Sequence, residues 1–321
     1  MNTKDTTVAA TAAASSMADS QFATGIACAI GGTFLFAMKS IFIKFAFAAG
    51  GTTIVILTLR LLISLPFYCA ILTYLLWKQN AQDATTSDRQ PLTVRLVGVA
   101  MGLGFLGYYL AALLDVSGLA MISAQLERLT LFTYPTMIAV LAWMFLGEEL
   151  NRRIILALVL CYAGVFLMYT KEQGMTSGSN IKLGVFLVMC SALSYSLYIL
   201  FAKPTMQRIG SKEFTSLAMI GSTVFVFIHF LATESIGGLF RIPVDIWMYC
   251  AILAFVCTVI PSYLISEAII RLGATRTTVI GSVGPVFTMI LAIIFLREPS
   301  SVFHFVGMGL AIFGVTFVMK K

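Results

Sequence analysis

The feature that most constrains this chain is a series of long apolar runs that carry almost no charge. Residues 184–202 contain no charged side chain, and residues 275–296 contain only Arg276. A helix needs about 20 apolar residues to cross a bilayer, and a backbone in hydrocarbon must satisfy its own hydrogen bonds as a helix or a closed barrel. These runs are longer and more continuous than the alternating segments of a barrel strand. The sequence therefore predicts an all-α integral membrane protein.

The composition favours the same class. Only 11% of the 321 residues are charged, against about 25% in a soluble domain. The net charge of +7 is then expected to orient the loops across the membrane, and we expect no nucleic-acid partner. All six cysteines lie in apolar runs without a CxxC pair, so we expect neither disulfides nor a metal site.

Ten transmembrane helices are expected, after a disordered cytoplasmic tail at residues 1–22. Their approximate ranges are 23–47, 53–77, 94–115, 119–146, 152–170, 182–202, 214–232, 247–270, 275–296 and 302–319. With the N-terminus inside, 13 of the 21 Lys and Arg residues fall in cytoplasmic segments and 4 in outer loops. This bias predicts that both termini are cytoplasmic, in a bacterial inner (plasma) membrane.

An internal repeat divides the chain. An offset of 150 residues aligns Ala124 with Ala274, Pro135 with Pro285 and Glu148 with Glu298 without a gap. A weaker match at an offset of 159 aligns Gly25 with Gly184 and Lys44 with Lys203. Each repeat, 23–171 and 182–321, would hold five helices. Because five is odd, the second copy would enter from the opposite side, which gives two inverted five-helix repeats with a site between them.

The two copies of one segment also carry a family resemblance. The runs are YPTMIAVLAWMFLGEEL and GPVFTMILAIIFLREPS, and the last span of each repeat holds AGV (163–165) or FGV (313–315). The chain thereby resembles the drug/metabolite transporter superfamily, in its ten-helix EamA-type branch, over nearly all of its length after the tail. The resemblance implies transport of small metabolites, often export, with no bound cofactor. Charged residues inside the first, second and fourth spans depart from many relatives.

Those intramembrane charges are the strongest candidates for a substrate site, because charges inside a bilayer are costly and mostly functional. Lys39, Arg60, Glu127 and Arg128 all fall roughly 10–14 Å below the outer surface of a core about 30 Å thick. Lys39 or an Arg could hold a carboxylate, and Glu127 could carry a proton in coupling. The alternative is a structural network, for example between Glu127 and Arg60.

Other polar residues have weaker claims. Lys44 is nearer the surface and could snorkel to it, and Asp115 is expected to end its helix or to pair locally. Glu267 and Arg271, four residues apart, could form a surface pair or an inner gate. Candidate cavity tyrosines are Tyr108, Tyr134, Tyr195 and Tyr263, whose alternative role is hydrogen bonding between helices.

One motif is set aside. Gly102, Gly104 and Gly107 fit G-x-G-x-x-G, but they lie inside an apolar span without the preceding strand that a dinucleotide site needs. Together with the G-x-x-x-G formed by Gly98 and Gly102, they are expected to allow close helix packing.

The function predicted from these features is secondary transport by alternating access. The substrate expected is a small carboxylate-bearing metabolite such as an amino acid or organic acid, moved by an exporter or exchanger. The partners are then this substrate and the lipid bilayer, with a second copy of the chain if it forms a homodimer. A membrane-embedded enzyme acting on a lipid-like substrate would need clustered carboxylates for Mg²⁺, and the acids here are scattered. A channel or sensor is the other alternative, and we expect no catalytic residues.

Overall fold

In the computed structural model, every regular element in the described residues is a helix. The structure describes residues 21–81, 92–147, 149, 152–175, 180–239, 242–272 and 274–319. Eight helical segments in these ranges are long and apolar enough to cross a membrane: Gln21–Ala48, Thr53–Lys78, Val94–Leu119, Ala124–Leu146, Ile154–Glu172, Ile181–Ile209, Ser211–Thr233 and Val244–Ile269. Two shorter apolar helices, Gly284–Phe295 and Val302–Thr316, follow. The all-α membrane fold is confirmed, and the predicted tail at 1–22 lies almost entirely outside the described residues.

Two segments that the sequence predicts as continuous spans are broken in the middle. The fourth consists of α6 (Ala124–Leu131) and α7 (Tyr134–Leu146), and the ninth of α14 (Ala274–Gly281) and α15 (Gly284–Phe295). Pro135 and Pro285 lie at the start of α7 and α15. A proline ring clashes with the carbonyl four residues earlier, which belongs to Leu131 or Gly281, the last residues of α6 and α14. The breaks leave α6 and α14 as short helices inside the bundle.

A second irregularity also occurs twice. A π-helical segment, η1 (Phe105–Leu110), joins α4 (Val94–Gly104) to α5 (Ala111–Leu119). A second one, η2 (Phe255–Val259), joins α12 (Val244–Ala254) to α13 (Ile260–Leu272). The two π-helical segments begin 150 residues apart, as do α4 and α12, and α6 and α14. The offset found in the sequence is therefore also the offset between corresponding helix boundaries.

The same correspondence appears in helix packing between the two halves of the chain. A Cβ on Gly25, in the first span, would lie 2.8 Å from Leu272 Cγ of α13. A Cβ on Gly184, in α9 (Ile181–Ile209), would lie 2.6 Å from Ile122 Cγ2, just after α5. The offsets of 159 and 150 residues map Gly25 to Gly184 and Ile122 to Leu272. Each half thus packs its glycine against the matching position of the other half.

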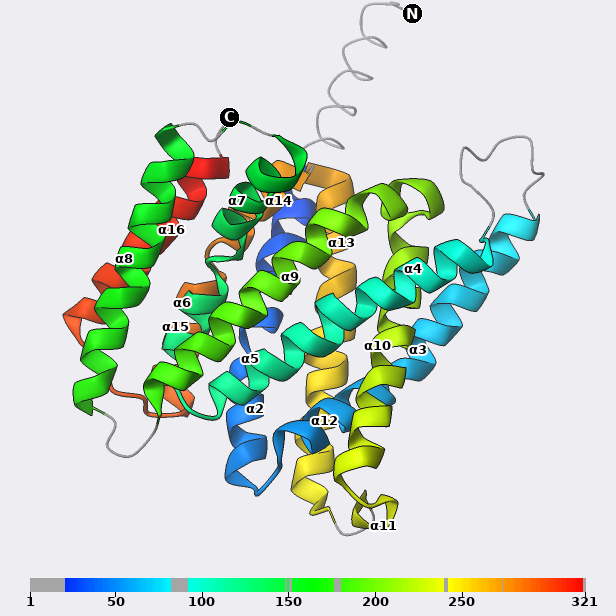
Figure 1. Ribbon diagram of the computed structural model, residues 1–321, viewed down its shortest axis with the longest axis horizontal. Helices are drawn as coiled ribbons and strands as arrows, with labels where there is room; N and C mark the ends of the chain where they lie inside the picture. The colour runs from blue at the N-terminus through cyan, green and yellow to red at the C-terminus, as the bar shows by residue number, and fades with distance from the viewer. Residues whose placement is uncertain are drawn as a thin grey trace, which may run out of the picture.

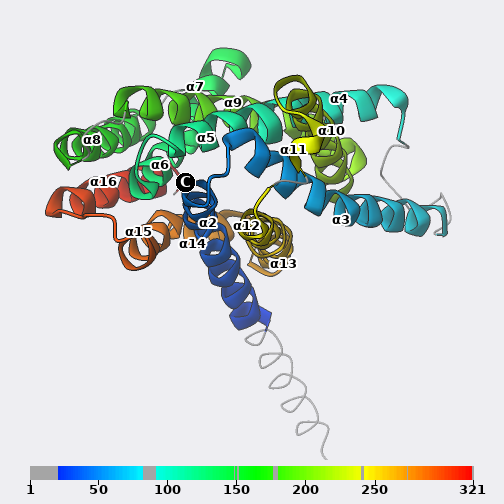
Figure 2. The same cartoon turned by 90° about the horizontal axis from the view of Figure 1, so that it is seen from below.

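The helices form two groups with the first span between them. In Figure 2, α4, α5, α7 and α9 lie along one side, and α12, α13, α14 and α15 along the other. At one edge of the bundle, α8 (Arg152–Met175) runs beside α16 (Val302–Met319), as Figure 1 shows. Their contact is close because Gly164 and Gly307 face each other, and a Cβ on Gly164 would lie 2.4 Å from the Gly307 carbonyl oxygen.

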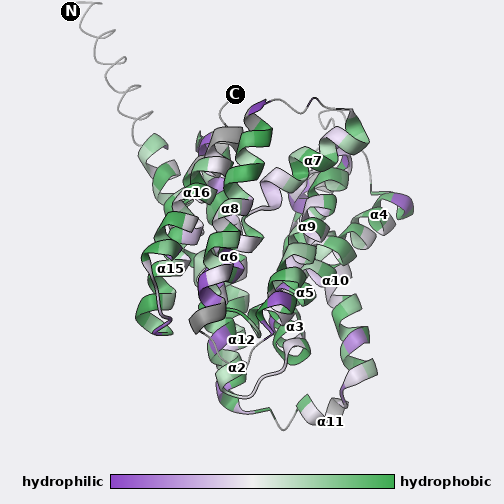
Figure 3. Ribbon diagram, turned by 60° about the vertical axis from the view of Figure 1, so that its left-hand side comes forward, coloured by the Kyte–Doolittle hydropathy of each residue, from purple (hydrophilic) through white to green (hydrophobic). Residues whose placement is uncertain are grey.

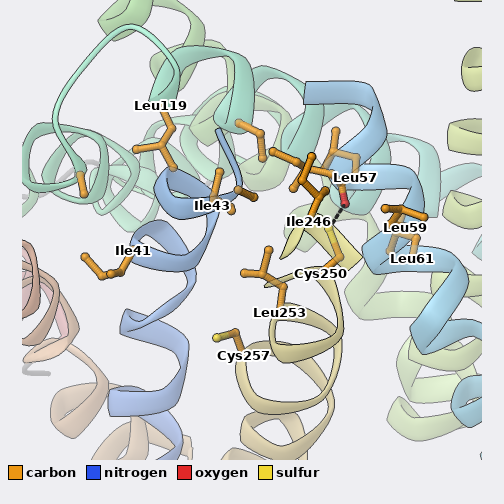
Figure 4. Packing of buried hydrophobic residues seen from close by; sticks show 14 of the residues in the cluster. Ile41, Ile43, Leu57, Leu59, Leu61, Leu119, Ile246, Cys250, Leu253 and Cys257 are labelled. Carbon is orange, nitrogen blue, oxygen red and sulfur yellow. Dashed lines mark hydrogen bonds between the residues drawn. The ribbon is translucent and has the colours of Figure 1, made fainter. Parts of the chain in front are cut away.

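The largest buried cluster joins α2 (Lys39–Ala48), α3 (Thr53–Ala81) and α12. In Figure 4, Leu253 and Cys250 of α12 lie between α2 and α3, whereas Ile41 projects from the far side of α2. The Cys250 thiol donates a hydrogen bond to the Ile56 carbonyl oxygen at 3.8 Å. Inside a membrane such packing is stabilised by van der Waals contact more than by exclusion of water.

Apolar side chains also cover the outside, as expected for a surface in contact with lipid. Trp143, Phe166 and Phe186 are at least half exposed, and Figure 3 shows hydrophobic residues along most of every long helix. Two further elements complete the described chain, α10 (Ser211–Thr233), which packs against α3 and α4, and the short α11 (Ile236–Leu239).

Candidate functional site

A cavity of about 470 Å³ lies between the two groups of helices. Its volume is within the range of about 300–1,000 Å³ that is usual for small-molecule sites. Its charged lining residues in the described chain are Lys39, Arg60, Asp115 and Arg128. The lining extends from these residues to Ile269 and Thr277, toward the end of the bundle where α14 lies at the top of Figure 1. Lys39, Arg60 and Arg128, which the sequence placed at one depth, are thus brought together.

Lys39 makes the closest charge contact in the cavity. Its Nζ lies 2.6 Å from Asp115 Oδ2, and the two side chains are 18% and 4% exposed. Lys39 begins α2, after a turn at Met38 that interrupts the first span. The expectation that Asp115 ends its helix or pairs locally is wrong. Helix α5 continues to Leu119, and the partner is 76 residues away. The pairing keeps both charges compensated away from water.

Glu127 lies behind this pair and is fully buried. Its Oε2 accepts a hydrogen bond from the Ser40 hydroxyl at 2.6 Å, and Oε1 has no hydrogen-bond partner in the described residues. The carboxyl group of Glu127 also interacts with that of Asp115. The alternative pairing of Glu127 with Arg60 is not formed among the described residues. Ser40 takes that position because it follows Lys39 at the start of α2 and faces α6.

Two guanidinium groups in the cavity have no acidic partner among the described residues. Arg60, on α3, is 8% exposed, and its Nε has no hydrogen-bond partner among the described residues. Arg128, on α6, lines the cavity beside Tyr134 and Tyr195. In the part of the chain that the structure describes, neither lies within salt-bridge distance of a carboxylate. The cavity therefore carries excess positive charge.

Tyrosines form the cavity wall next to Arg128. The Tyr198 hydroxyl donates to the Tyr108 hydroxyl at 3.2 Å, and the rings of Tyr134 and Tyr195 meet edge to face at 5.4 Å. Tyr108, Tyr134 and Tyr195 line the cavity, as proposed from sequence, whereas Tyr263 is 44% exposed and is absent from the described lining. Tyr263 lies on the outward face of α13.

Tyr68 is a lining residue that the sequence reasoning missed. It is 7% exposed and interacts with Arg60. Its position in the sequence could have indicated this role. Tyr68 follows Arg60 by eight residues on α3, or about two helical turns, and therefore lies on a neighbouring face of the helix.

At the opposite end from Thr277, three ionisable side chains hold the turn between α5 and α6. Lys44 Nζ donates to the Ile122 carbonyl oxygen at 2.7 Å. The Ser123 N–H and hydroxyl donate to the Glu172 carboxylate at 2.6 and 2.7 Å. The Glu298 carboxylate accepts the N–H groups of Ala124 and Gln125 at 2.8 and 3.3 Å. Lys44 therefore binds the backbone inside the bundle, and the expectation that it snorkels is wrong.

Glu298 illustrates how this end is stabilised. The first N–H groups of any helix have no partner within it, and a negative charge there complements the helix dipole. Glu298 comes from the loop between α15 and α16, 174 residues after Ala124. The sequence singled out Glu298 as part of the repeat, but nothing in the sequence pointed to its partner.

Glu267 and Arg271 form the expected i,i+4 pair near the end of α13. Arg271 Nη2 lies 2.7 Å from Glu267 Oε1, and the side chains are 29% and 43% exposed. Exposed pairs of this kind contribute little to stability. A role in gating stays a prediction.

In the glycine-rich motif, Gly104 and Gly107 allow close helix packing as expected, whereas Gly98 and Gly102 do not. A Cβ on Gly104 would lie 2.1 Å from the Ala218 carbonyl oxygen, and one on Gly107 would enter the Tyr198 ring. In the part of the chain that the structure describes, nothing lies within 4 Å of a Cβ position on Gly98 or Gly102, so this G-x-x-x-G pair makes no close helix contact there. Among the described residues, no three His, Cys, Asp or Glu side chains come together as a candidate metal site.

Known proteins resemble this chain over most of its length. The uncharacterized transporter YcbK of Bacillus subtilis is 26% identical over 289 residues, which cover 89% of both chains. An uncharacterized transporter of Synechocystis sp. is 26% identical over 71% of this chain and 68% of its own length. A solved crystal structure superposes with a TM-score of 0.57 at 14% identity, over 92% of this chain and 96% of that one. This last likeness concerns the fold alone.

The family comparison matches each half separately. The model of the EamA-like transporter family matches residues 23–170 and again residues 182–320. Together the two matches cover nearly all of the chain and leave out the segment around residues 171–181 that joins the halves. The chain belongs to the EamA-like transporter family.

Proposed function

We propose that the protein is a secondary transporter, an exporter or exchanger, that moves a small carboxylate-bearing metabolite by alternating access. The observation that carries the proposal is the excess positive charge of the cavity, where Arg60 and Arg128 form no salt bridge with a described residue and lie in the same lining as the Lys39–Asp115 pair. A guanidinium group binds a carboxylate through two parallel hydrogen bonds. The volume of about 470 Å³ suits an amino acid or organic acid with some water.

Alternating access requires two related halves that move against each other around the site. We propose ten membrane spans in two inverted repeats, in which α14 and α15 together form the ninth span. The shared offset of 150 residues and the exchanged glycine contacts support this arrangement. In the proposed orientation both termini are cytoplasmic, in the inner membrane of a bacterium.

In that orientation the structure would represent the inward-facing state. The cavity extends toward Ile269 and Thr277, on the proposed cytoplasmic side. The contacts of Lys44, Glu172 and Glu298 with the α5–α6 turn would close the outer side. Because α6 carries Glu127 and Arg128 next to this closed end, a change at the site could be transmitted directly to the outer contacts.

The test is uptake of amino acids and organic acids into liposomes that contain the purified protein. Lys39→Ala and Glu127→Gln should bring uptake close to that of empty liposomes, whereas Lys203→Ala, an exposed lysine of α9, should not. Wild-type uptake rates in both Lys39→Ala and Glu127→Gln would contradict the assignment of these residues to the transport site. An imposed pH gradient should change the rate if Glu127 carries a proton, and a flat response would leave exchange without proton coupling.

A further inference from the structure

The cavity contains more positive charge than one carboxylate can use. Lys39 is compensated by Asp115 at 2.6 Å, and Glu127, which accepts a hydrogen bond from Ser40, is neutral in the protonated form of the proposed coupling. That leaves the guanidinium groups of Arg60 and Arg128. Arg60 is 8% exposed and lines the cavity with an Nε that no described group binds. A buried charge without a partner is strongly disfavoured, so we expect a ligand group to compensate it in the loaded state.

The two guanidinium groups lie in different parts of the cavity. Arg60 comes from α3 and interacts with Tyr68, Cys250 and Cys257, on the side of α12 and η2. Arg128 comes from α6, and its charge acts on Tyr134 and Tyr195, on the side of α7 and α9. Both interact with Asp115, the residue that pairs with Lys39.

The position of Asp115 disfavours a single anion shared by both arginines. Because Asp115 interacts with both guanidinium groups, an anion shared by Arg60 and Arg128 would also be repelled by the Asp115 carboxylate. Two anionic groups, one at each guanidinium, avoid this repulsion and compensate both cations. The Lys39 ammonium, next to Asp115, is left to face the polar middle of such a molecule.

We propose that the substrate is a dicarboxylate, with one carboxylate bound by Arg60 and the other by Arg128. This inference rests on the proposed transport function and specifies the substrate class of the same cavity. It also assigns specificity to the two arginines, because each would recognise one end of the molecule. Transport would then discriminate dicarboxylates from monocarboxylates and from neutral amino acids by the second charge.

The experiment is a counterflow assay in liposomes that contain the full-length protein. Saturated dicarboxylates of four to six carbons are compared with monocarboxylates of the same lengths, with neutral amino acids and with inorganic phosphate. Wild-type protein should prefer one of the dicarboxylates over the matched monocarboxylate by about 10- to 100-fold, the range expected for one hydrogen-bonded charge pair. Arg60→Gln and Arg128→Gln should each lower transport of that dicarboxylate by about 10- to 100-fold, so that its preference over the matched monocarboxylate is lost.

Variants with conserved charge separate recognition from folding. Arg60→Lys and Arg128→Lys keep the cation but lose the bidentate geometry, so they should retain a reduced preference for the dicarboxylate. Arg208→Gln, at an exposed position of α9, is the matched control and should behave as wild type. The melting temperature of each purified variant shows whether it is folded.

The outcomes distinguish this inference from the proposed function. Equal transport of mono- and dicarboxylates, with both falling together in Arg60→Gln and Arg128→Gln, would overturn the dicarboxylate and leave a carboxylate transporter. Preference for phosphate or for neutral amino acids would overturn it as well. Absence of counterflow for every compound tested would contradict both proposals.

Discussion

The first and second halves of the bundle share their packing but differ at the site. The offset of 150 residues aligns the starts of α4, α6, α7 and α8 with those of α12, α14, α15 and α16, and the starts of the two π-helical segments with each other. At the same offset Asp115, Glu127 and Arg128 align with Ile265, Thr277 and Thr278. A symmetric scaffold thus carries an asymmetric set of charges. Among the described residues, the charged side chains that line the cavity all come from the first half.

The largest expected effect comes from removing a charge that only the first half has. Asp115→Leu leaves Lys39 without a partner in a site away from water, which should lower the free energy of unfolding by about 3–5 kcal/mol. Unfolding in detergent, followed by circular dichroism, measures this. At the matched position Ile265→Leu should cost less than about 1.5 kcal/mol. Equal losses at the two positions would contradict the asymmetry of charge.

A smaller effect is expected at the contact between the halves. Glu298→Ala removes the acceptor of the Ala124 and Gln125 N–H groups and should cost about 1–3 kcal/mol, because those donors are left unpaired. Glu298→Asp should lose less. The melting temperature of the purified protein checks both. Glu148→Ala, at the residue that matches Glu298 in sequence, measures whether the other half depends on its glutamate to the same degree.

Equal effects are expected where the two halves pack alike. Gly25→Ala and Gly184→Ala each bring a methyl group to within 3 Å of a neighbouring side chain. Each should cost about 1–3 kcal/mol through overpacking, and the two losses should agree within error. Gly102→Ala is the control, because nothing lies within 4 Å of its Cβ position. If only one of the two Ala variants lost stability, the two halves would share their backbone arrangement but not the tight packing at these glycines.

The smallest effect on stability is expected at the partly exposed pair of α13. Glu267→Gln should change the free energy of unfolding by no more than about 0.5 kcal/mol. Transport is the more informative readout, because an unchanged rate identifies a surface pair. A large fall in rate with unchanged stability would instead assign the pair to the inner gate.

The sequence predicted the membrane fold and most of the cavity, for identifiable reasons. Uncharged apolar runs define helices directly, and charged residues such as Lys39, Arg60 and Arg128 stand out within them. The contacts between the charged side chains were predicted less well than their positions. Asp115 binds Lys39 and Glu127 binds Ser40, and these contacts depend on how α2 begins and how the helices cross, which periodicity does not encode. Tyr263 was misplaced because helix rotation decides whether a tyrosine faces the cavity or the lipid.

The capping of α6 by Glu298 also has a consequence for biosynthesis. At about 5–20 residues per second, the ribosome needs roughly 10–35 s to make the 174 residues between Ala124 and Glu298. If α6 is inserted during that time, its first N–H groups lack the Glu298 carboxylate that caps them in the folded protein. We therefore expect the first half to lack part of its stabilising contacts until Glu298, near the end of the chain, has been synthesised. Truncated chains that stop before Glu298 should be preferred targets of membrane quality-control proteases.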